Sequence, residues 1–228
     1  MASSKDRKKK RQIDYLNPLE RIYVFCEGKQ TEPLYFKGFE KAIKNNPIYK
    51  NLVHIHIEGV GAETLRVIYY AEEYVKQNNI KGAQIWCVYD KDSFPTQDFN
   101  AVSQRAEMLN EQQNKVTYHC AWSNQCIEYW FILNFANYTS DNDRKDYRQF
   151  LHRKFKELGW TRYEKNNEEL FEIMTKKGDQ KKAIVYAQRQ LDAFRGKTDT
   201  QSVPATKVHL LVQELAKYLP DDIKSKYI

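Results

Sequence analysis

The sequence predicts an α/β fold, with a parallel sheet flanked by helices and a C-terminal helical layer or subdomain packed on it. Two continuous apolar runs, residues 22–26 and 84–90, have the composition of strands that are covered on both faces. Helical patterns alternate with the strand patterns up to about residue 135, which favours a parallel sheet with crossover helices. Beyond about residue 137 only helical patterns recur, so that portion should pack as helices against the sheet.

The alternating part contains four predicted strands and four predicted helices. Val53, Ile55 and Ile57 alternate with polar residues, which is typical of a strand exposed on one face. The strands are expected at 22–26, 53–58, 84–90 and 116–122, and the helices at about 32–45, 63–78, 99–109 and 127–135.

We therefore divide the chain into three parts: a basic flexible arm at 1–14, an α/β core at 15–137 and a helical portion at 138–228. Helices in the last part are predicted to end near Gly159 and to span 167–175, 180–195 and 207–218, with a loop at 196–204.

The composition favours a folded protein with a polyanionic partner, without establishing one. The 228 residues include 41% hydrophobic and 14% aromatic side chains and carry a formal net charge of +7. The arm is rich in Lys and Arg and is expected either to bind nucleic acid or to act as a solvated tail. No apolar run of about 18 residues occurs, so we expect no membrane contact and a cytoplasmic location. The four cysteines are scattered and form no CxxC pair, so we expect them to be reduced.

Acidic residues follow two of the predicted strands. Glu27 comes directly after the run 22–26 and precedes Gly28, which is expected to allow a sharp turn at the carboxyl end of the strand. Asp90 and Asp92 end the run 84–90, and in extended backbone their side chains leave on the same side. If the two strands are neighbours, the three acids face one another and can share a Mg²⁺ or Mn²⁺ ion. The alternatives are a surface carboxylate at Glu27 and an Asp-x-Asp turn that caps its own loop.

A second group of possible metal ligands lies on the predicted strand 53–58. His54, His56 and Glu58 share its polar face, and imidazole and carboxylate groups can bind a transition metal. Side chains in this position more often simply face water.

Several motifs together resemble the bacterial RloB family, over about residues 20–215. They are Cys26-Glu27-Gly28 with Thr31-Glu32 and Tyr35-Phe36, Asp90-Lys91-Asp92, the stretch Asn124 to Phe135 that contains Glu128, and the segment Ser202 to His209. The family occurs in restriction and antiphage loci and resembles the Toprim fold. Gln125 departs from the pattern, since the family commonly has proline there.

The resemblance implies roles for the acidic residues. Toprim domains act on phosphodiesters with Mg²⁺, using a glutamate after the first strand and a later Asp-x-Asp pair. Glu27 then becomes the general acid/base or a metal ligand, and Asp90 and Asp92 become metal ligands. Glu128 matches a family acid that opens an apolar helix, where it either binds metal or complements the helix dipole. Lys29 and Lys91, beside the acids, either hold the substrate or are solvated neighbours.

Two functions follow from these expectations. The first is a Mg²⁺-dependent endonuclease that cleaves DNA or RNA in antiphage defence. The second is a non-catalytic sensor that binds nucleic acid or a nucleotide through the same metal site and acts through a partner protein from a defence locus.

Overall fold

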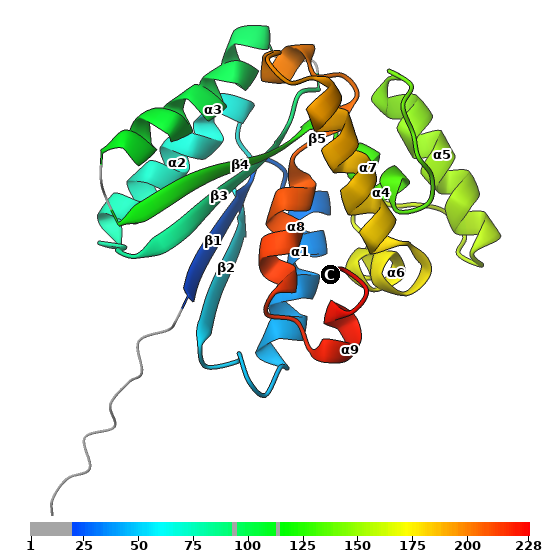
Figure 1. The fold of residues 1–228 in the computed structure, drawn as a ribbon, viewed down its shortest axis with the longest axis horizontal. Helices are drawn as coiled ribbons and strands as arrows, with labels where there is room; N and C mark the ends of the chain where they lie inside the picture. Colours follow the sequence, from blue (N-terminus) through cyan, green and yellow to red (C-terminus); the bar gives the residue numbers. More distant parts are fainter. Residues whose placement is uncertain (1–19, 93–94, 113–114) are drawn as a thin grey trace, which may run out of the picture.

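A five-stranded sheet forms the centre of the protein (Figure 1). The computed structural model describes residues 20–92, 95–112 and 115–228, so the predicted arm at 1–14 lies outside the described residues. The strand order is β2-β1-β3-β4-β5, and β1 to β4 are parallel, as predicted, whereas β5 is antiparallel to β4. The strands are β1 (Glu20–Cys26), β2 (Val53–Gly59), β3 (Ala83–Asp90), β4 (Val116–Asn124) and β5 (Ala205–Thr206).

Helices cover both faces of the sheet, which confirms the predicted α/β class. One face packs against α2 and α3, and the other against α1 and α8 (Figure 1). The described helices are α1 (Thr31–Lys44), α2 (Thr64–Gln77), α3 (Thr96–Glu111), α4 (Glu128–Leu133), α5 (Arg144–Glu157), α6 (Leu170–Lys177), α7 (Gln180–Ala193), α8 (Val208–Ala216) and α9 (Asp221–Lys224).

The order in which successive strands are added to the sheet reverses between β1 and β3. From β1 the chain crosses to β2 through α1, and from β2 it crosses back over β1 to β3 and then to β4. The carboxyl ends of β1 and β3 therefore lie side by side at the switch point, which is where open α/β sheets bind their ligands.

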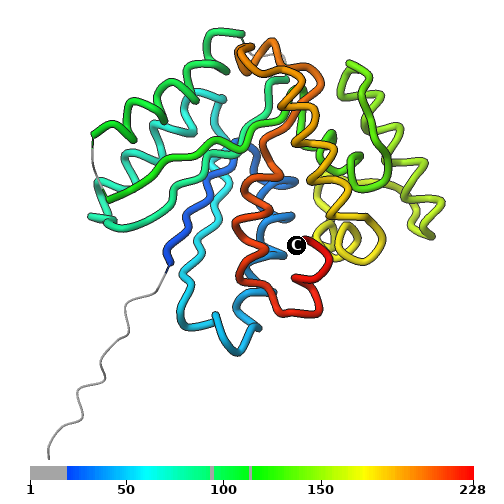
Figure 2. The backbone as a smooth tube through the Cα atoms, in the orientation of Figure 1, coloured from blue at the N-terminus to red at the C-terminus, as the bar shows by residue number. Residues whose placement is uncertain are grey.

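The helices after α4 pack against the core on the α1 side. Phe171 of α6 stacks edge-on against Phe39 of α1, with ring centroids 4.6 Å apart. The chain's C-terminal end returns to the same place, beside α6 (Figure 2), where the Tyr227 hydroxyl lies 2.7 Å from the Thr175 hydroxyl. These contacts bury one continuous apolar core between the sheet and the C-terminal helices.

The strand β5 is a feature that the sequence did not predict. Its two residues lie between the expected loop and the expected closing helix, and the strand is too short to show a period. The Thr206 hydroxyl donates to the carbonyl of Trp122 (3.0 Å), and the Lys207 amide donates to the same carbonyl (2.8 Å).

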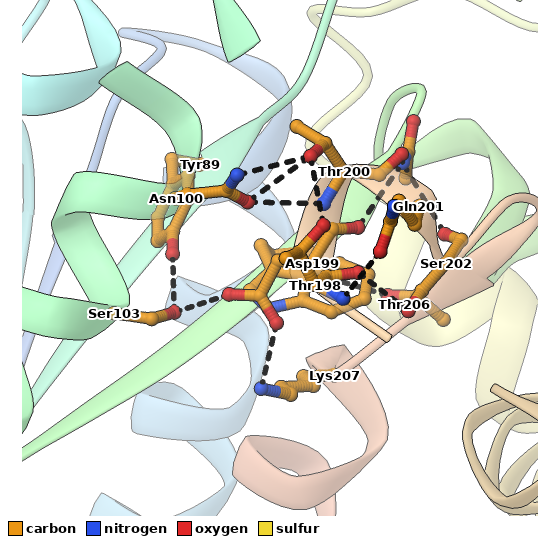
Figure 3. A network of polar contacts seen from close by, with 12 residues as sticks. Tyr89, Asn100, Ser103, Thr198, Asp199, Thr200, Gln201, Ser202, Thr206 and Lys207 are labelled. Carbon is orange, nitrogen blue, oxygen red and sulfur yellow. Dashed lines mark hydrogen bonds and ion pairs between the residues drawn. The ribbon is translucent and has the colours of Figure 1, made fainter. Parts of the chain in front are cut away.

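A network of side chains, which we call the Asp199 clamp, fixes the segment before β5 (Figure 3). The Asp199 carboxylate accepts a hydrogen bond from the Ser103 hydroxyl (2.5 Å) and pairs with the Lys207 ammonium group (3.1 Å). The Asn124 amide, at the end of β4, donates to the carbonyls of Asp199, Thr200 and Ser202 at 3.2–3.3 Å. The clamp therefore joins α3, the end of β4 and residues 198–207.

None of the described helices is both long enough and apolar enough to cross a membrane. The cysteines are free, and Cys26, Cys87 and Cys126 are buried.

Candidate acidic site at the carboxyl edge of the sheet

Glu27 lies at the switch point and is held by both neighbouring elements. Its backbone N–H donates to the Val88 carbonyl of β3 (2.8 Å), which continues the β1–β3 pairing by one residue. Its carboxylate accepts the Asp90 backbone N–H (2.9 Å) and the Thr64 hydroxyl (3.3 Å). The side chain is 9% exposed, so Glu27 is a buried carboxylate and the alternative of a surface carboxylate is wrong.

Gly28 has a different role from the one predicted. Its backbone does not adopt a positive φ, so the turn itself does not require glycine. A Cβ at this position would lie 2.4 Å from Oε2 of Glu32, which is closer than real Cβ atoms approach. The Glu32 carboxylate occupies the space beside the turn, so a larger residue at position 28 requires this carboxylate to move.

The start of α1 lies directly after the turn that follows Glu27. Thr31 is the first helical residue, Gln30 precedes it, and no side chain caps this end. Pro33 lies in the first turn, where a missing backbone N–H is tolerated. Thr31 and Glu32 are both buried beside Glu27.

Asp90 and Asp92 meet at one pocket, although not through the predicted extended backbone. β3 ends at Asp90, and Asp92 has a φ of 39°, so the chain turns between the two residues. The Lys91 and Asp92 amides donate to the carbonyls of Ser123 (3.0 Å) and Gln125 (2.9 Å), which ties the turn to the end of β4. The peptide bond between Asn124 and Gln125 is cis.

A pocket of about 450 Å³ opens between these residues, and we call it the acidic pocket. Two lysines line it besides the acids: Lys29 from the turn after β1 and Lys165 from the segment between α5 and α6. The stem of Lys29 lies over Gly61, where a Cβ would be 2.0 Å from its Cε. Lys91 is not among the lining residues, which are Glu27, Gly28, Lys29, Gln30, Thr31, Glu32, Ala62, Asp90, Asp92 and Lys165.

Glu128 lies beside the acidic pocket and outside its lining. It is the first residue of α4 and is fully buried, and it makes no capping hydrogen bond. Its Oε1 accepts from Nε of Arg148 (3.2 Å) and lies 3.9 Å from Nζ of Lys165. Glu128 thus lies in the first turn of α4, where its charge complements the helix dipole, and its carboxylate is also paired with cations of the C-terminal helical portion.

Burial and mutual repulsion disfavour the charged forms of Glu27, Glu32 and Asp90. Burial raises the pKa of Glu27 to about 7, against hydrogen bonds from Asp90 and Thr64 that lower it. Burial also raises the pKa of Asp90 well above its usual range, and the charges of Glu32 and Glu128 raise it further. The pKa of Glu32 is raised by burial and by Glu128, while the charge of Lys165 lowers it.

The chemistry of the acidic pocket fits a hard divalent cation. Three carboxylate oxygens that are shielded from solvent, Oδ1 of Asp90, Oδ1 of Asp92 and Oε2 of Glu128, have no well-formed hydrogen bond. A cation would satisfy such oxygens and relieve the repulsion that raises the pKa of Asp90. As the side chains stand, no three His, Cys, Asp or Glu residues in the described ranges are grouped as a ready-made metal site. Mg²⁺ needs only one or two protein carboxylates, because water and phosphate supply its other ligands.

The polar side chains of β2 have contacts of their own, which argues against a transition-metal site there. The His56 ring lies 3.1 Å from the Glu58 carboxylate and stacks on Tyr74, and Glu58 also accepts from the Tyr70 hydroxyl (2.6 Å). These residues have partners of their own and form no group that could hold a metal.

Sequence reasoning missed four residues of the site. Glu32 belongs to the Thr31-Glu32 motif of the family resemblance, directly after the turn that follows the predicted strand, which was a usable signal. Lys165, Arg144 and Arg148 come from the polar part of the chain, where nothing in the sequence distinguishes them from solvated residues. Arg144 pairs with Asp92 (Nη1 to Oδ2, 3.0 Å), as Arg148 does with Glu128.

Comparison with known proteins gives a match to a sequence family. No curated protein and no solved structure gives a significant match. A family model described as RloB-like protein matches residues 22–215, which include Glu27, Asp90, Asp92 and Glu128. The chain therefore belongs to the RloB-like protein family.

Proposed function

We propose that the protein is a Mg²⁺-dependent nuclease that hydrolyses phosphodiester bonds of DNA or RNA in bacterial antiphage defence. The observation that carries this proposal is the meeting of Glu27, Asp90 and Asp92 in one pocket at the switch point of the sheet. The Toprim resemblance of the same three residues supports it.

The residues of the acidic pocket would have three roles in hydrolysis: metal binding, proton transfer and contact with the substrate phosphate. Asp90 and Asp92 would hold the ion through the oxygens that lack partners, with Mn²⁺ as a possible substitute for Mg²⁺. A bound ion would neutralise the phosphate and lower the pKa of a water molecule. Glu27, with its pKa raised to about 7, can accept a proton from the attacking water or donate one to the leaving oxygen. Lys29 lines the pocket and can contact a substrate phosphate.

Two of the predicted site residues, Lys91 and Glu128, lie outside the lining of the acidic pocket. Lys91 does not line the pocket, so we assign it no contact with the reacting phosphate. Glu128 remains a proposed metal ligand for a second ion, since its Oε2 lacks a well-formed hydrogen bond.

The test is cleavage by the purified full-length chain. Labelled single-stranded and double-stranded DNA and RNA are incubated with Mg²⁺, with Mn²⁺ and with EDTA. We expect cleavage of at least one polymer with metal and none with EDTA, and loss of cleavage in Glu27→Gln. The matched control is Asp221→Asn, a change at an exposed carboxylate in α9.

The non-catalytic sensor is the second candidate. Its support is that lysines line the acidic pocket beside the carboxylates, which suits phosphate recognition through a metal without cleavage. Metal-dependent binding of an oligonucleotide or nucleotide, with no cleavage of any polymer, would decide for this candidate. A partner protein from a defence locus would then supply the effect on the cell.

A further inference from the structure

Three cations of the C-terminal helical portion reach the acids of the sheet edge. Arg144 and Arg148 are four residues apart on α5, so they lie on the same face of that helix. Arg144 contacts Asp92, Arg148 contacts Glu128, and Lys165 contacts both Glu128 and the acidic pocket. The core therefore supplies the acids and the later part of the chain supplies their counter-ions.

The two sides of these ion pairs differ in exposure. The side chains of Arg144, Arg148 and Lys165 are 47%, 34% and 48% exposed, whereas their partners Asp92 and Glu128 are 25% and 0% exposed. The acids are fixed in the protein, and the cations approach them from the solvent side. A long cationic side chain in this position can turn to another anion without any movement of the backbone.

A second, smaller pocket adjoins the acidic pocket at Asp92. Its volume is about 200 Å³, and it is lined by Asp92, Gln125, Asp143, Arg144 and Lys145. The Asp143 carboxylate caps α5 by accepting from the amides of Lys145 and Asp146. Arg144 thus lines the smaller pocket together with its partner Asp92, and Lys145 adds a second cation to that lining.

From this arrangement we infer that Arg144, Arg148 and Lys165 form an exchangeable phosphate-binding site. While no divalent cation is present, the three side chains neutralise Asp92 and Glu128. When a divalent cation binds the acids, it replaces these side chains as the source of positive charge. The guanidinium and ammonium groups then bind phosphates of the nucleic-acid backbone next to the bond that is cleaved. This inference rests on the proposed function, because it needs a divalent cation and a nucleic acid at the same edge.

Removal of one of the three cationic side chains should strengthen the binding of Mn²⁺ and weaken the binding of an oligonucleotide. Arg144→Gln and Lys165→Gln should each bind Mn²⁺ about two- to fivefold more tightly than wild type, because a competing positive charge is gone. Each should bind an uncleavable phosphorothioate oligonucleotide roughly tenfold more weakly in the presence of Mn²⁺, because a charged hydrogen bond is lost. Each removal should also lower the slope of log affinity against log salt by about one.

The measurements are calorimetric titration of Mn²⁺ into the full chain and fluorescence anisotropy of the labelled oligonucleotide at several salt concentrations. Arg153→Gln is the matched control, because Arg153 is an exposed residue of the same helix. Arg144→Lys should restore most of the oligonucleotide affinity. Arg148→Gln is avoided, since it would leave the buried Glu128 without its closest cation and would risk unfolding.

The outcomes separate this inference from the proposed function. If wild type binds Mn²⁺ and the oligonucleotide but both variants behave as Arg153→Gln does, the three cations are only structural counter-ions and the inference is wrong. If the variants bind Mn²⁺ more tightly and the oligonucleotide more weakly, the inference stands whether or not any polymer is cleaved. A wild-type chain that binds neither ligand overturns both the inference and the proposed function.

Discussion

The acidic pocket and the Asp199 clamp are two polar clusters near the same end of the sheet, and they differ in how well their polar groups are partnered. In the clamp, the Asp199 carboxylate has a hydroxyl and an ammonium partner, and the Asn124 amide donates to three carbonyls. In the pocket, Oδ1 of Asp90 is shielded from solvent and has no partner, and neighbouring negative charges raise the pKa of Asp90. Both clusters are built around carboxylates, but the clamp pairs Asp199 with Lys207, whereas the pocket leaves Oδ1 of Asp90 without a partner.

This difference indicates different roles. A fully partnered buried network stabilises one arrangement of the chain, whereas unpartnered buried oxygens cost free energy unless a ligand satisfies them. The clamp is therefore expected to contribute to the stability of the fold, and the pocket is expected to bind a ligand at some expense of stability. The predictions below test this contrast from the largest expected effect to the smallest.

Asp90→Asn and Asp199→Asn should have opposite consequences. Asp90→Asn removes a charge from the pocket while its size is kept, so cleavage should fall by about 100-fold or more. The free energy of unfolding in EDTA at pH 8 should be unchanged or higher, because repulsion among the acids decreases. Asp199→Asn should keep cleavage within a few-fold of wild type and should lower the free energy of unfolding. Initial rates and urea unfolding check both variants, and wild-type rates in a folded Asp90→Asn would remove the pocket from the mechanism.

Asn124→Ala should test the clamp alone. The variant loses three hydrogen bonds and leaves carbonyls of residues 199–202 without their donor, so the free energy of unfolding should fall by about 1–3 kcal/mol. The matched control is Asn51→Ala, at an exposed turn position. Equal unfolding free energies for the two variants would show that the clamp does not stabilise the fold.

The free energy of unfolding should depend on pH, because acids of the pocket have raised pKa values in the folded state. Between pH 4.5 and about 7 folded Glu27 retains a proton that the unfolded chain has lost. The folded state then binds more protons than the unfolded state, so this residue's contribution to stability is present at pH 4.5 and is lost as the pH rises to about 7. Asp90, whose pKa is also raised, acts in the same direction.

The measurement compares wild type with Glu27→Gln by urea unfolding in EDTA across this pH range. The variant should gain stability relative to wild type as the pH rises, and saturating Mg²⁺ should abolish the gain by stabilising the charged form of Glu27. A difference that does not change with pH would mean that Glu27 is already ionised at pH 4.5.

Glu32→Gln should have the smallest effect. Glu32 lines the acidic pocket, and its charge raises the pKa of Glu27 and of Asp90. Its removal should weaken Mg²⁺ binding by a few-fold and raise stability slightly in EDTA. Calorimetric titration and thermal unfolding check this, with Glu40→Gln on the same helix as the control. Tighter Mg²⁺ binding in Glu32→Gln would show that Glu32 competes with the site instead of supporting it.

Local patterns in the sequence predicted most of the fold. The four parallel strands and the helices between them were expected close to their observed positions, because their apolar periods reflect burial on two faces or on one. The strand β5 was missed, because two residues carry no period and their pairing depends on Asn124 and the Asp199 clamp.

The candidate site was predicted in part for a similar reason. Glu27 and Asp90 each follow a buried strand, so the topology of a parallel sheet was enough to bring them to one edge. Asp92 reaches the pocket through a turn that is hydrogen-bonded to the carbonyl of Gln125, a contact that lies outside the range of local pattern.

The sequence by itself thus determined the four parallel strands of the sheet, the edge at which its acids gather and the membership in the RloB-like family. The tertiary structure alone decided how those acids are paired. Arg144, Arg148 and Lys165 are separated from Glu27 by more than a hundred residues, and only the packing of the helices after α4 brings them to Asp92 and Glu128. The raised pKa of Glu27 also depends on the tertiary structure, because burial and the neighbouring carboxylates cause it. Neither cause can be read from the spacing of residues along the chain.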